Sequence, residues 1–282
     1  MRTTRVVSRR FLIAAAALVP MAACAPALHA GLSSEPVTAD SSHLTLTTFN
    51  IWHNMGDWPA RRPLLIEALR AQNADVIALQ EVLEDANTGL ENQAEMLARE
   101  LGGYKVAFVS TDPEGAPRRY GSALLTRLPI LAQDSVRLEP LDDYRTALRV
   151  RVSVADRPVD VVVTHLAHQP EAGAVRARQI SHLLSWLPQD GVPLVVMGDF
   201  NAPQEDPGLA TMTGPRFVSA LPPGSAATTL NPAKGHASRV IDHIFVEPEF
   251  FTPTAAHVFG DQPTNGEYPS DHFGVTATVA LN

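Results

Sequence analysis

The sequence contains a single cysteine, Cys24, so residues 25–282 can form no internal disulfide. Its longest apolar run, residues 11–23, covers 13 positions. That length is too short for a helix that spans a bilayer, and it suits the core of a signal peptide. Basic residues are also scarce, because 22 Lys and Arg stand against 30 Asp and Glu. This acidic balance argues against a protein that coats nucleic acid.

Several catalytic motifs are missing as well. The sequence has no HExxH motif and no histidine-rich ligand cluster, so we do not expect a zinc protease. It has no GxSxG elbow, no P-loop and no GxGxxG motif. The tripeptide at 270–272, Ser-Asp-His, does not by itself predict a serine triad, since no serine carries a nucleophile signature.

The first 23 residues are typical of an export signal. Four arginines precede the apolar run, "SRRFL" (8–12) resembles a twin-arginine signal, and "MAAC" (21–24) resembles a lipobox ending at Cys24. We therefore predict an exported protein, periplasmic or in the cell envelope, anchored to the membrane through lipidated Cys24. The alternative is an ordinary signal peptide cleaved between Ala23 and Ala30. Residues 24–42 are predicted to be a linker, and removal of residues 1–23 leaves 18 basic against 30 acidic residues, a net charge of −12.

Residues 43–282 are predicted to form one α/β domain. Apolar periodicity predicts helices over 59–72, 89–103 and 174–187, and a short helix near 206–212 within a loop that spans 201–238. Strands are predicted over 44–50, 75–82, 121–127, 146–154, 158–165, 192–200, 239–246 and 272–281. Helices between strands indicate sheets covered by helices, and successive strands without a helix indicate mixed or antiparallel sheets. Two packed sheets flanked by helices satisfy both observations.

Polar side chains follow six of these apolar runs. The residues delivered at the ends are Asn50, Glu81, His165, Asp199 with Asn201, Asp242, and Asp271 with His272. Each one alone is explained as a turn or cap residue. A carboxylate inside an apolar segment, as at Glu81 and Asp242, is costly without a cation or donors.

The spacing of the paired residues adds two expectations. Asp199 and Asn201 are two apart and face the same side if the chain is extended, whereas the adjacent Asp271 and His272 should have different partners. Carboxylate and amide oxygens suit Mg²⁺ or Mn²⁺, and histidine and amide donors suit phosphate oxygens. The set as a whole therefore predicts a site for a metal ion and a phosphate.

The motifs "TFNIW" (48–52), "LQEV" (79–82), "THL" (164–166), "GDFN" (198–201), "IDHI" (241–244) and "SDH" (270–272) occur in this order. Together they resemble the endonuclease/exonuclease/phosphatase superfamily, whose members include deoxyribonuclease-I-like and neutral-sphingomyelinase-like phosphoesterases. The resemblance covers residues 44–281 and implies a four-layer α/β sandwich.

The resemblance also implies roles for the residues. It implies metal ligation by Glu81, with Asn50 and Asp271 near the same ion, which would be Mg²⁺ or its substitute Mn²⁺. It implies that Asp199 orients or deprotonates the attacking water and that Asn201 and His165 hold the scissile phosphate. His272, oriented by Asp242, would complete the acid–base set. Arg145 stands where relatives often carry a phosphate-binding arginine, and the alternative is a solvated charge at a strand end.

The predicted function is hydrolysis of phosphoesters, with phosphodiesters preferred, by an Mg²⁺-dependent monomer. The substrate could be a small molecule, a lipid or a nucleic acid, so a DNA nuclease and a sphingomyelinase-like lipid phosphodiesterase remain alternatives. A surface protein that keeps the fold and only binds is a further alternative. The sequence departs from the family pattern at His243, where relatives often have tyrosine, and it lacks a basic, aromatic-rich insertion for duplex DNA. Trp52, His53, Trp58 and His168 lie near the predicted mouth of the site, as substrate rim or as packing residues, with packing favoured for Trp58.

Overall fold

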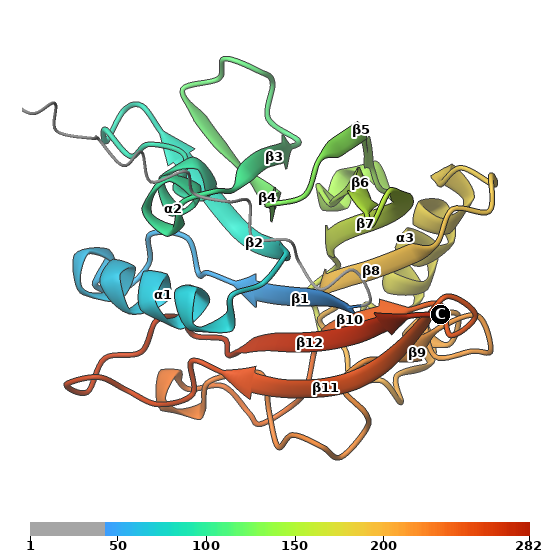
Figure 1. Ribbon diagram of the computed structural model, residues 1–282. Coiled ribbons are helices and arrows are strands. Elements are labelled where there is room, and N and C mark those ends of the chain that lie inside the picture. Colours follow the sequence, from blue (N-terminus) through green and yellow to red (C-terminus); the bar gives the residue numbers. More distant parts are fainter. Residues whose placement is uncertain (1–42) are drawn as a thin grey trace, which may run out of the picture. The chain divides into compact units, whose positions relative to one another are not determined.

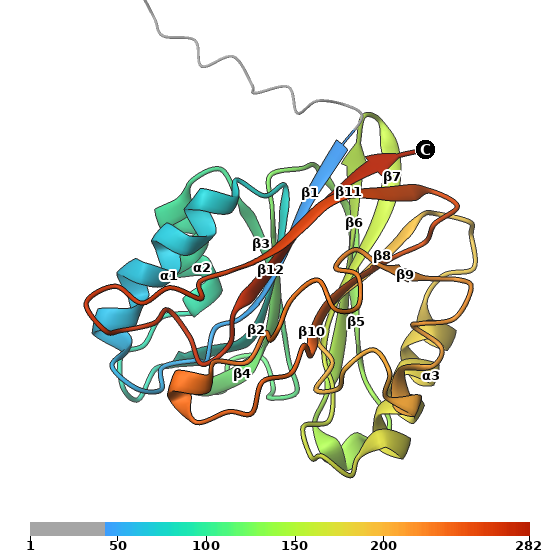
Figure 2. The ribbon, with the colours of Figure 1, turned by 90° about the horizontal axis from the view of Figure 1, so that it is seen from below.

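Two six-stranded sheets pack face to face, with helices on their outer faces, in a computed structural model that describes residues 43–282. Figure 2 shows α1 and α2 on one side of the paired sheets and α3 on the other. The four layers are those of an α/β sandwich, which confirms the predicted fold class. The predicted signal (1–23) and linker (24–42) lie outside the described residues. None of the helices between residues 43 and 282 has the length and apolar character that a membrane span requires.

Three α-helices and twelve strands make up this part of the chain (Figure 1). The helices are α1 (Trp58–Gln72), α2 (Gln93–Leu101) and α3 (Gly173–Trp186), with short 3-10 turns η1 (Leu141–Asp143), η2 (Pro207–Leu209) and η3 (Pro232–Lys234). The strands are β1 (His43–Asn50), β2 (Val76–Asp85), β3 (Lys105–Ser110), β4 (Arg118–Thr126), β5 (Ile130–Arg137), β6 (Thr146–Val154), β7 (Arg157–His165), β8 (Leu194–Asp199), β9 (Val218–Ser219), β10 (Asp242–Val246), β11 (Phe251–Phe259) and β12 (Gly274–Leu281).

Both sheets are mixed. The first has the order β11-β12-β1-β2-β4-β3 and the second has the order β5-β6-β7-β8-β10-β9. Each sheet contains one parallel pair joined by a helix, β1 with β2 through α1 and β7 with β8 through α3. A parallel pair places the carboxyl ends of both strands at the same edge of its sheet. These two edges carry the residues described below.

The central strands are apolar on both faces because both faces are covered. In β1, Leu44 and Leu46 belong to the core between the sheets, whereas Phe49 packs in the layer beneath α1 and α2. A third apolar layer, which includes Ile180 and Leu183 of α3, covers the second sheet. The apolar runs that looked like buried strands in the sequence are explained by this double burial.

The structure also corrects several expected boundaries. The helix expected over 89–103 begins only at Gln93, because Leu90 pairs with Asp85 and the side chain of Asn92 caps the helix by accepting from Ala94 N. The strands expected over 121–127 and 146–154, which correspond to β4 and β6, lie in different sheets. The strands β3, β5, β9 and β11 were not expected from the sequence. All four are outer strands of their sheets, and β5 and β11 are largely exposed.

Candidate active site

A cleft of about 790 Å³ opens at the carboxyl ends of the parallel strand pairs. Most of the predicted site residues line it, namely Glu81, Arg145, His165, Asp199, Asn201, Asp271 and His272. The other two, Asn50 and Asp242, are fully buried and hydrogen-bond to residues of the cleft wall. The structure therefore brings every predicted site residue to one place.

Strand register explains this convergence. His165, the last residue of β7, lies beside Asp199, the last residue of β8. Because β10 runs antiparallel to β8, its first residue, Asp242, lies on the other side of Asp199. Gly198 permits the close approach of β8 to β7. Its φ is +147°, and a Cβ there would stand 1.9 Å from the carbonyl oxygen of Thr164.

Glu81 reaches the cleft through a β-bulge in β2. The pairing of β2 with β4 shifts between Leu79 and Val82, and Glu81 has a φ of +59°. Such a bulge redirects a side chain that a regular strand would place elsewhere. The Nδ2 of Asn50 donates to Glu81 Oε1 at 3.3 Å and to Asp199 Oδ2 at 3.0 Å. Asn50 therefore links a carboxylate of the first sheet to one of the second.

Asp199 is almost completely buried, with 1% of its surface exposed. Burial and the nearby charge of Asp242 raise the pKa of Asp199 to about 7. Its carboxyl group can therefore accept and release a proton near neutral pH. The Oδ1 atom accepts a 2.8 Å hydrogen bond from the backbone N–H of Asn201. Asn201 itself has a φ of +53°, so the extended segment expected there is a turn, although both side chains line the cleft.

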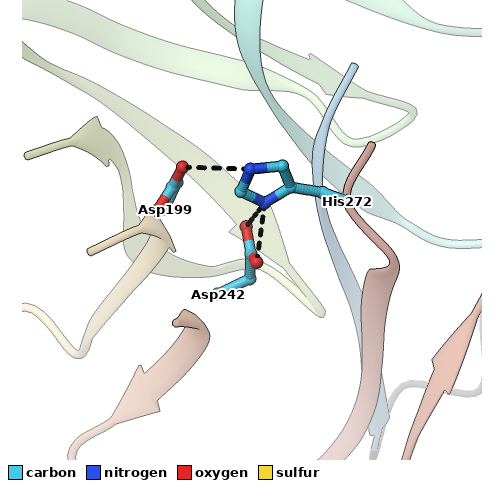
Figure 3. A group of neighbouring side chains, drawn as sticks. All are labelled: Asp199, Asp242 and His272. Atoms are coloured by element: carbon cyan, nitrogen blue, oxygen red, sulfur yellow. Dashed lines mark hydrogen bonds and ion pairs between the residues drawn. The ribbon is translucent and has the colours of Figure 1, made fainter. Parts of the chain in front are cut away.

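His272 lies between two carboxylates, as Figure 3 shows. Its Nδ1 donates to Asp242 Oδ2 at 3.0 Å, and its Nε2 lies 3.9 Å from Asp199 Oδ2. Burial by itself would lower the pKa of His272, but Asp242 and the other nearby carboxylates raise it to about 10. His272 therefore holds its proton at neutral pH and presents Nε2–H toward Asp199. The neighbouring Asp271 instead accepts a 3.0 Å bond from His236, which confirms the expected difference in partners.

His165 carries no charge at neutral pH. Burial, followed by the positive charges of Arg145 and His272, lowers the pKa of His165 well below 6.5. Its Nε2 lies 3.3 Å from Asp199 Oδ2. Arg145 lines the cleft, with its Nη2 at 3.1 Å from His168 Nδ1 and its Nε at 3.6 Å from Asp143. Arg145 is thus held at the cleft rather than being a solvated strand-end charge.

Two cleft residues carried no sequence signal. Tyr120 of β4 lies beside Glu81, and burial together with the charge of Glu81 raises the pKa of Tyr120 far above its ordinary value. His236 comes from the long loop before β10. Neither residue ends an apolar run, which was the pattern that revealed the others.

The residues expected near the mouth divide into two groups. His53 and His168 line the cleft, whereas Trp58 packs with the apolar layer beneath α1 and α2, as favoured. Trp52 stacks with Arg61. His243 points away from the cleft, because it is fully buried against Phe200 and Phe245.

Two buried arginines fix the loops around the cleft. Arg61 of α1 donates to the carbonyl oxygens of Met55, Ile51, Pro269, Trp52 and His53. These carbonyls follow Asn50 and precede Asp271. Arg176 of α3 does the same in the second sheet, with the carbonyls of Ala167, Gln169 and Pro170, which follow His165. Each parallel strand pair therefore has a helix arginine that holds the loop after its first strand.

The model of the endonuclease/exonuclease/phosphatase family matches residues 47–272, which contain all the site residues. The chain belongs to this family. Enzymes of the family are divalent-metal-dependent hydrolases of phosphoesters and nucleic acids. No curated protein sequence matches the chain.

Solved structures of the endonuclease/exonuclease/phosphatase fold resemble this one. The human Nocturnin catalytic domain with bound sulfate has a TM-score of 0.70 and 21% identity, covering 85% of this chain and 95% of that one. A humanized D. rerio TDP2 gives 0.69 and 19%, covering 84% and 98%. A family protein from Bacteroides thetaiotaomicron gives 0.71 and 20%, covering 86% and 98%. These similarities support the same four-layer fold.

The donor atoms of the cleft fit the divalent metal that the family uses. Glu81 and Asp271 form no ion pair with Lys or Arg anywhere in residues 43–282, and the side chains paired with them are the imidazoles of His53, at 4.0 Å, and His236, at 3.0 Å. Two carboxylates left without a permanent cation in one cleft provide oxygen ligands for a divalent ion. The metal site formed by Glu81 and Asp271 does not include His272, the residue that stays protonated at neutral pH.

A second group could also hold a metal. Asp199, Asp242 and His272 offer ligand atoms within 4.8 Å of one another. A histidine must be neutral to ligate, and the raised pKa of His272 keeps it protonated. In the metal-free protein this group is thus less suited to a divalent ion than the carboxylate oxygens of Glu81 and Asp271.

Proposed function

We propose that the protein is an Mg²⁺-dependent phosphodiesterase that hydrolyses its substrate by in-line attack of a water molecule. The observation that carries the proposal is that one cleft contains both a group that can accept a proton, Asp199, and a group that stays protonated, His272. Asp199 has a pKa of about 7, and the His272 imidazole 3.9 Å away has a pKa of about 10. Two groups with separated pKa values are the requirement for acid–base chemistry at neutral pH.

In the proposed mechanism, Asp199 accepts the proton of the attacking water at Oδ2. The Nδ2 of Asn50 and the backbone N–H of Asn201 hold the Asp199 carboxylate in place for this step. His165 and Asn201 bind oxygens of the scissile phosphate. Protonated His272 stabilises the negative charge that develops on those oxygens, because its Nδ1 is fixed by Asp242.

Glu81 and Asp271, with Asn50 beside them, would hold the metal ion. When bound, Mg²⁺ would polarise a phosphoryl oxygen and stabilise the leaving oxygen. All three residues offer oxygen atoms, the ligand type that Mg²⁺ and Mn²⁺ prefer over zinc-type nitrogen and sulfur sets. The cleft is lined from both sheets and has a volume of about 790 Å³, and this size is the basis for preferring a diester.

A panel of phosphodiesters and phosphomonoesters tests the proposal. The purified protein should hydrolyse at least one phosphodiester in Mg²⁺ or Mn²⁺ and none in EDTA. Metal binding without turnover across the whole panel would instead support the alternative of a binding protein. Full turnover in EDTA would refute the metal-dependent mechanism.

We also propose that the protein is an exported monomer anchored through Cys24. The basis is the arginine-containing start, the apolar run and the lipobox-like residues that end at Cys24. Expression with radiolabelled palmitate should label the wild-type protein and leave Cys24→Ser unlabelled. An unlabelled wild-type protein would remove the proposed anchor, and size-exclusion chromatography tests the monomer.

A further inference from the structure

Two arginines of the cleft have no partner in the part of the chain that the structure describes. Arg118 is the first residue of β4 in the first sheet, and Arg239 lies in the loop that leads into β10 of the second sheet. Both line the cleft and both are exposed. Neither side chain donates a hydrogen bond or forms an ion pair within residues 43–282.

These two arginines stand apart from the rest. Every other arginine of residues 43–282 donates a side-chain hydrogen bond to a carboxylate, a carbonyl oxygen or another acceptor. The chain carries an excess of acidic residues, with a net charge of −8, so acceptors are abundant. The two unpaired guanidinium groups nevertheless both line the cleft.

Two further acidic residues that line the cleft, Asp112 and Asp143, already have partners. Asp112 accepts from the backbone N–H of Tyr120 and from Ser110. Asp143 accepts from Gln179 and lies beside Arg145. The two unpaired guanidinium groups therefore remain available to an external anion.

The scissile phosphate does not account for Arg118 and Arg239. In the proposed function, on which this inference rests, His165, Asn201 and His272 already serve that phosphate. A guanidinium group presents a planar fork of donors that matches the oxygens of a phosphate, and it keeps its charge at any relevant pH. The cleft is also large enough, at about 790 Å³, for a substrate that extends beyond one phosphate group.

We propose that Arg118 and Arg239 bind phosphate groups of the substrate other than the scissile one. The substrate class is then a phosphodiester that carries at least one further phosphate. A nucleotide chain and a phosphorylated inositol headgroup share this chemistry. A headgroup that ends in a quaternary ammonium, as in phosphocholine, would instead be repelled by the two cations.

Matched substrate pairs test this inference with the full chain in Mg²⁺. The nucleotide pair is the p-nitrophenyl ester of thymidine 5′-phosphate with and without a 3′-phosphate. The inositol pair is glycerophosphoinositol with and without a 4-phosphate. We expect kcat/KM to be about tenfold or more higher for the doubly phosphorylated member of one pair, because a hydrogen bond between charged groups contributes at least this factor. The pair that shows the preference identifies the source of the second phosphate.

The variants Arg118→Met and Arg239→Met should lower this ratio, and the double variant should bring it to about one. Lysine at the same positions should restore part of the ratio, since the charge remains and the fork is lost. The matched control is Arg99→Met, which removes one exposed arginine of α2 that pairs with Glu91 outside the cleft. Its ratio should equal that of the wild type.

A ratio of about one in both pairs for the wild type would overturn the inference while leaving the proposed function intact. A ratio that survives in the double variant would overturn it as well. If no substrate is hydrolysed, the proposed function fails, and calorimetry then decides the inference separately. Thymidine 3′,5′-bisphosphate should bind about tenfold more tightly than thymidine 5′-monophosphate, and equal affinities would overturn the proposal.

Discussion

The replacement Asp242→Asn should lower the pKa of His272 toward neutrality. Asp242 is fully buried, and its Oδ2 and Oδ1 lie 3.0 and 3.3 Å from His272 Nδ1. Asparagine keeps the size of the side chain and removes its charge. His272 is also buried, with 6% of its surface exposed, so little water is available to replace that charge.

The magnitude follows from the opposing effects on His272. Burial lowers the pKa of His272, yet the carboxylates raise it from 6.5 to about 10, with Asp242 the strongest of them. That rise corresponds to about 5 kcal/mol in favour of the protonated imidazole. Asp199 and Asp271 remain in the variant, so we expect the pKa of His272 to fall by about two to three units.

Nuclear magnetic resonance of the histidine ring nitrogens, followed across roughly pH 5–11 in the metal-free protein, measures this pKa directly. In the wild type, the rate in Mg²⁺ should rise near the pKa of Asp199, about 7, and fall near that of His272, about 10. The variant should lose the upper part of this range and about a hundredfold in kcat, the usual size of a lost acid–base group. Asp190→Asn, an exposed carboxylate paired with Arg151, is the control.

The same shift has a consequence for stability. The folded-state pKa of His272 lies above its unfolded value, so the protonated pair stabilises the fold fully below about pH 6.5 and loses this effect as pH rises through about 10. Wild-type stability should fall over that interval more steeply than the stability of Asp242→Asn. An unchanged His272 pKa in the variant, or a rate profile identical to that of the wild type, would refute this account of the pair.

Three further predictions concern the metal site, the strand contact and the loops. Glu81→Gln should weaken Mg²⁺ binding by about tenfold or more in calorimetry, because a carboxylate ligand becomes a neutral amide, and unchanged affinity would move the metal elsewhere. Gly198→Ala should destabilise the fold by about 3 kcal/mol or more in urea unfolding, because its Cβ would meet the Thr164 carbonyl at 1.9 Å; wild-type stability would contradict the close approach of the two strands. Arg61→Met should cost about 3 kcal/mol by leaving buried carbonyl oxygens unpaired, whereas Arg62→Met on the same helix loses only an exposed ion pair and should cost under about 1 kcal/mol; equal costs would contradict the role of Arg61.

The sequence predicted that the site residues lie close together, because most of them stand at the ends of buried strands. Buried strands are marked by apolar runs, and the parallel pairs bring the ends of those runs to one edge of each sheet. His165 and Asp199, which are far apart in the sequence, become neighbours in this way. The family motifs then supplied the expected roles, which the experiments above test.

Other features depended on contacts that no local pattern carries. The bulge at Glu81 arises from the pairing of β2 with β4, and the exposed strand β5 lacks an apolar face because it lies at the edge of its sheet. Arg118 and Arg239 looked like ordinary surface charges. Their significance comes from the pairing of the other arginines of residues 43–282, which only the three-dimensional structure shows.

The hydrolysis of bis-p-nitrophenyl phosphate tests the central claim most directly. The wild-type protein should release p-nitrophenol in Mg²⁺ and stop in EDTA, and Asp199→Ala and His272→Ala should each lose at least about a hundredfold in kcat with the fold retained. Circular dichroism of each variant checks the fold. Turnover by the wild type in EDTA, or wild-type rates in both variants, would contradict the assignment of metal-dependent catalysis to this cleft.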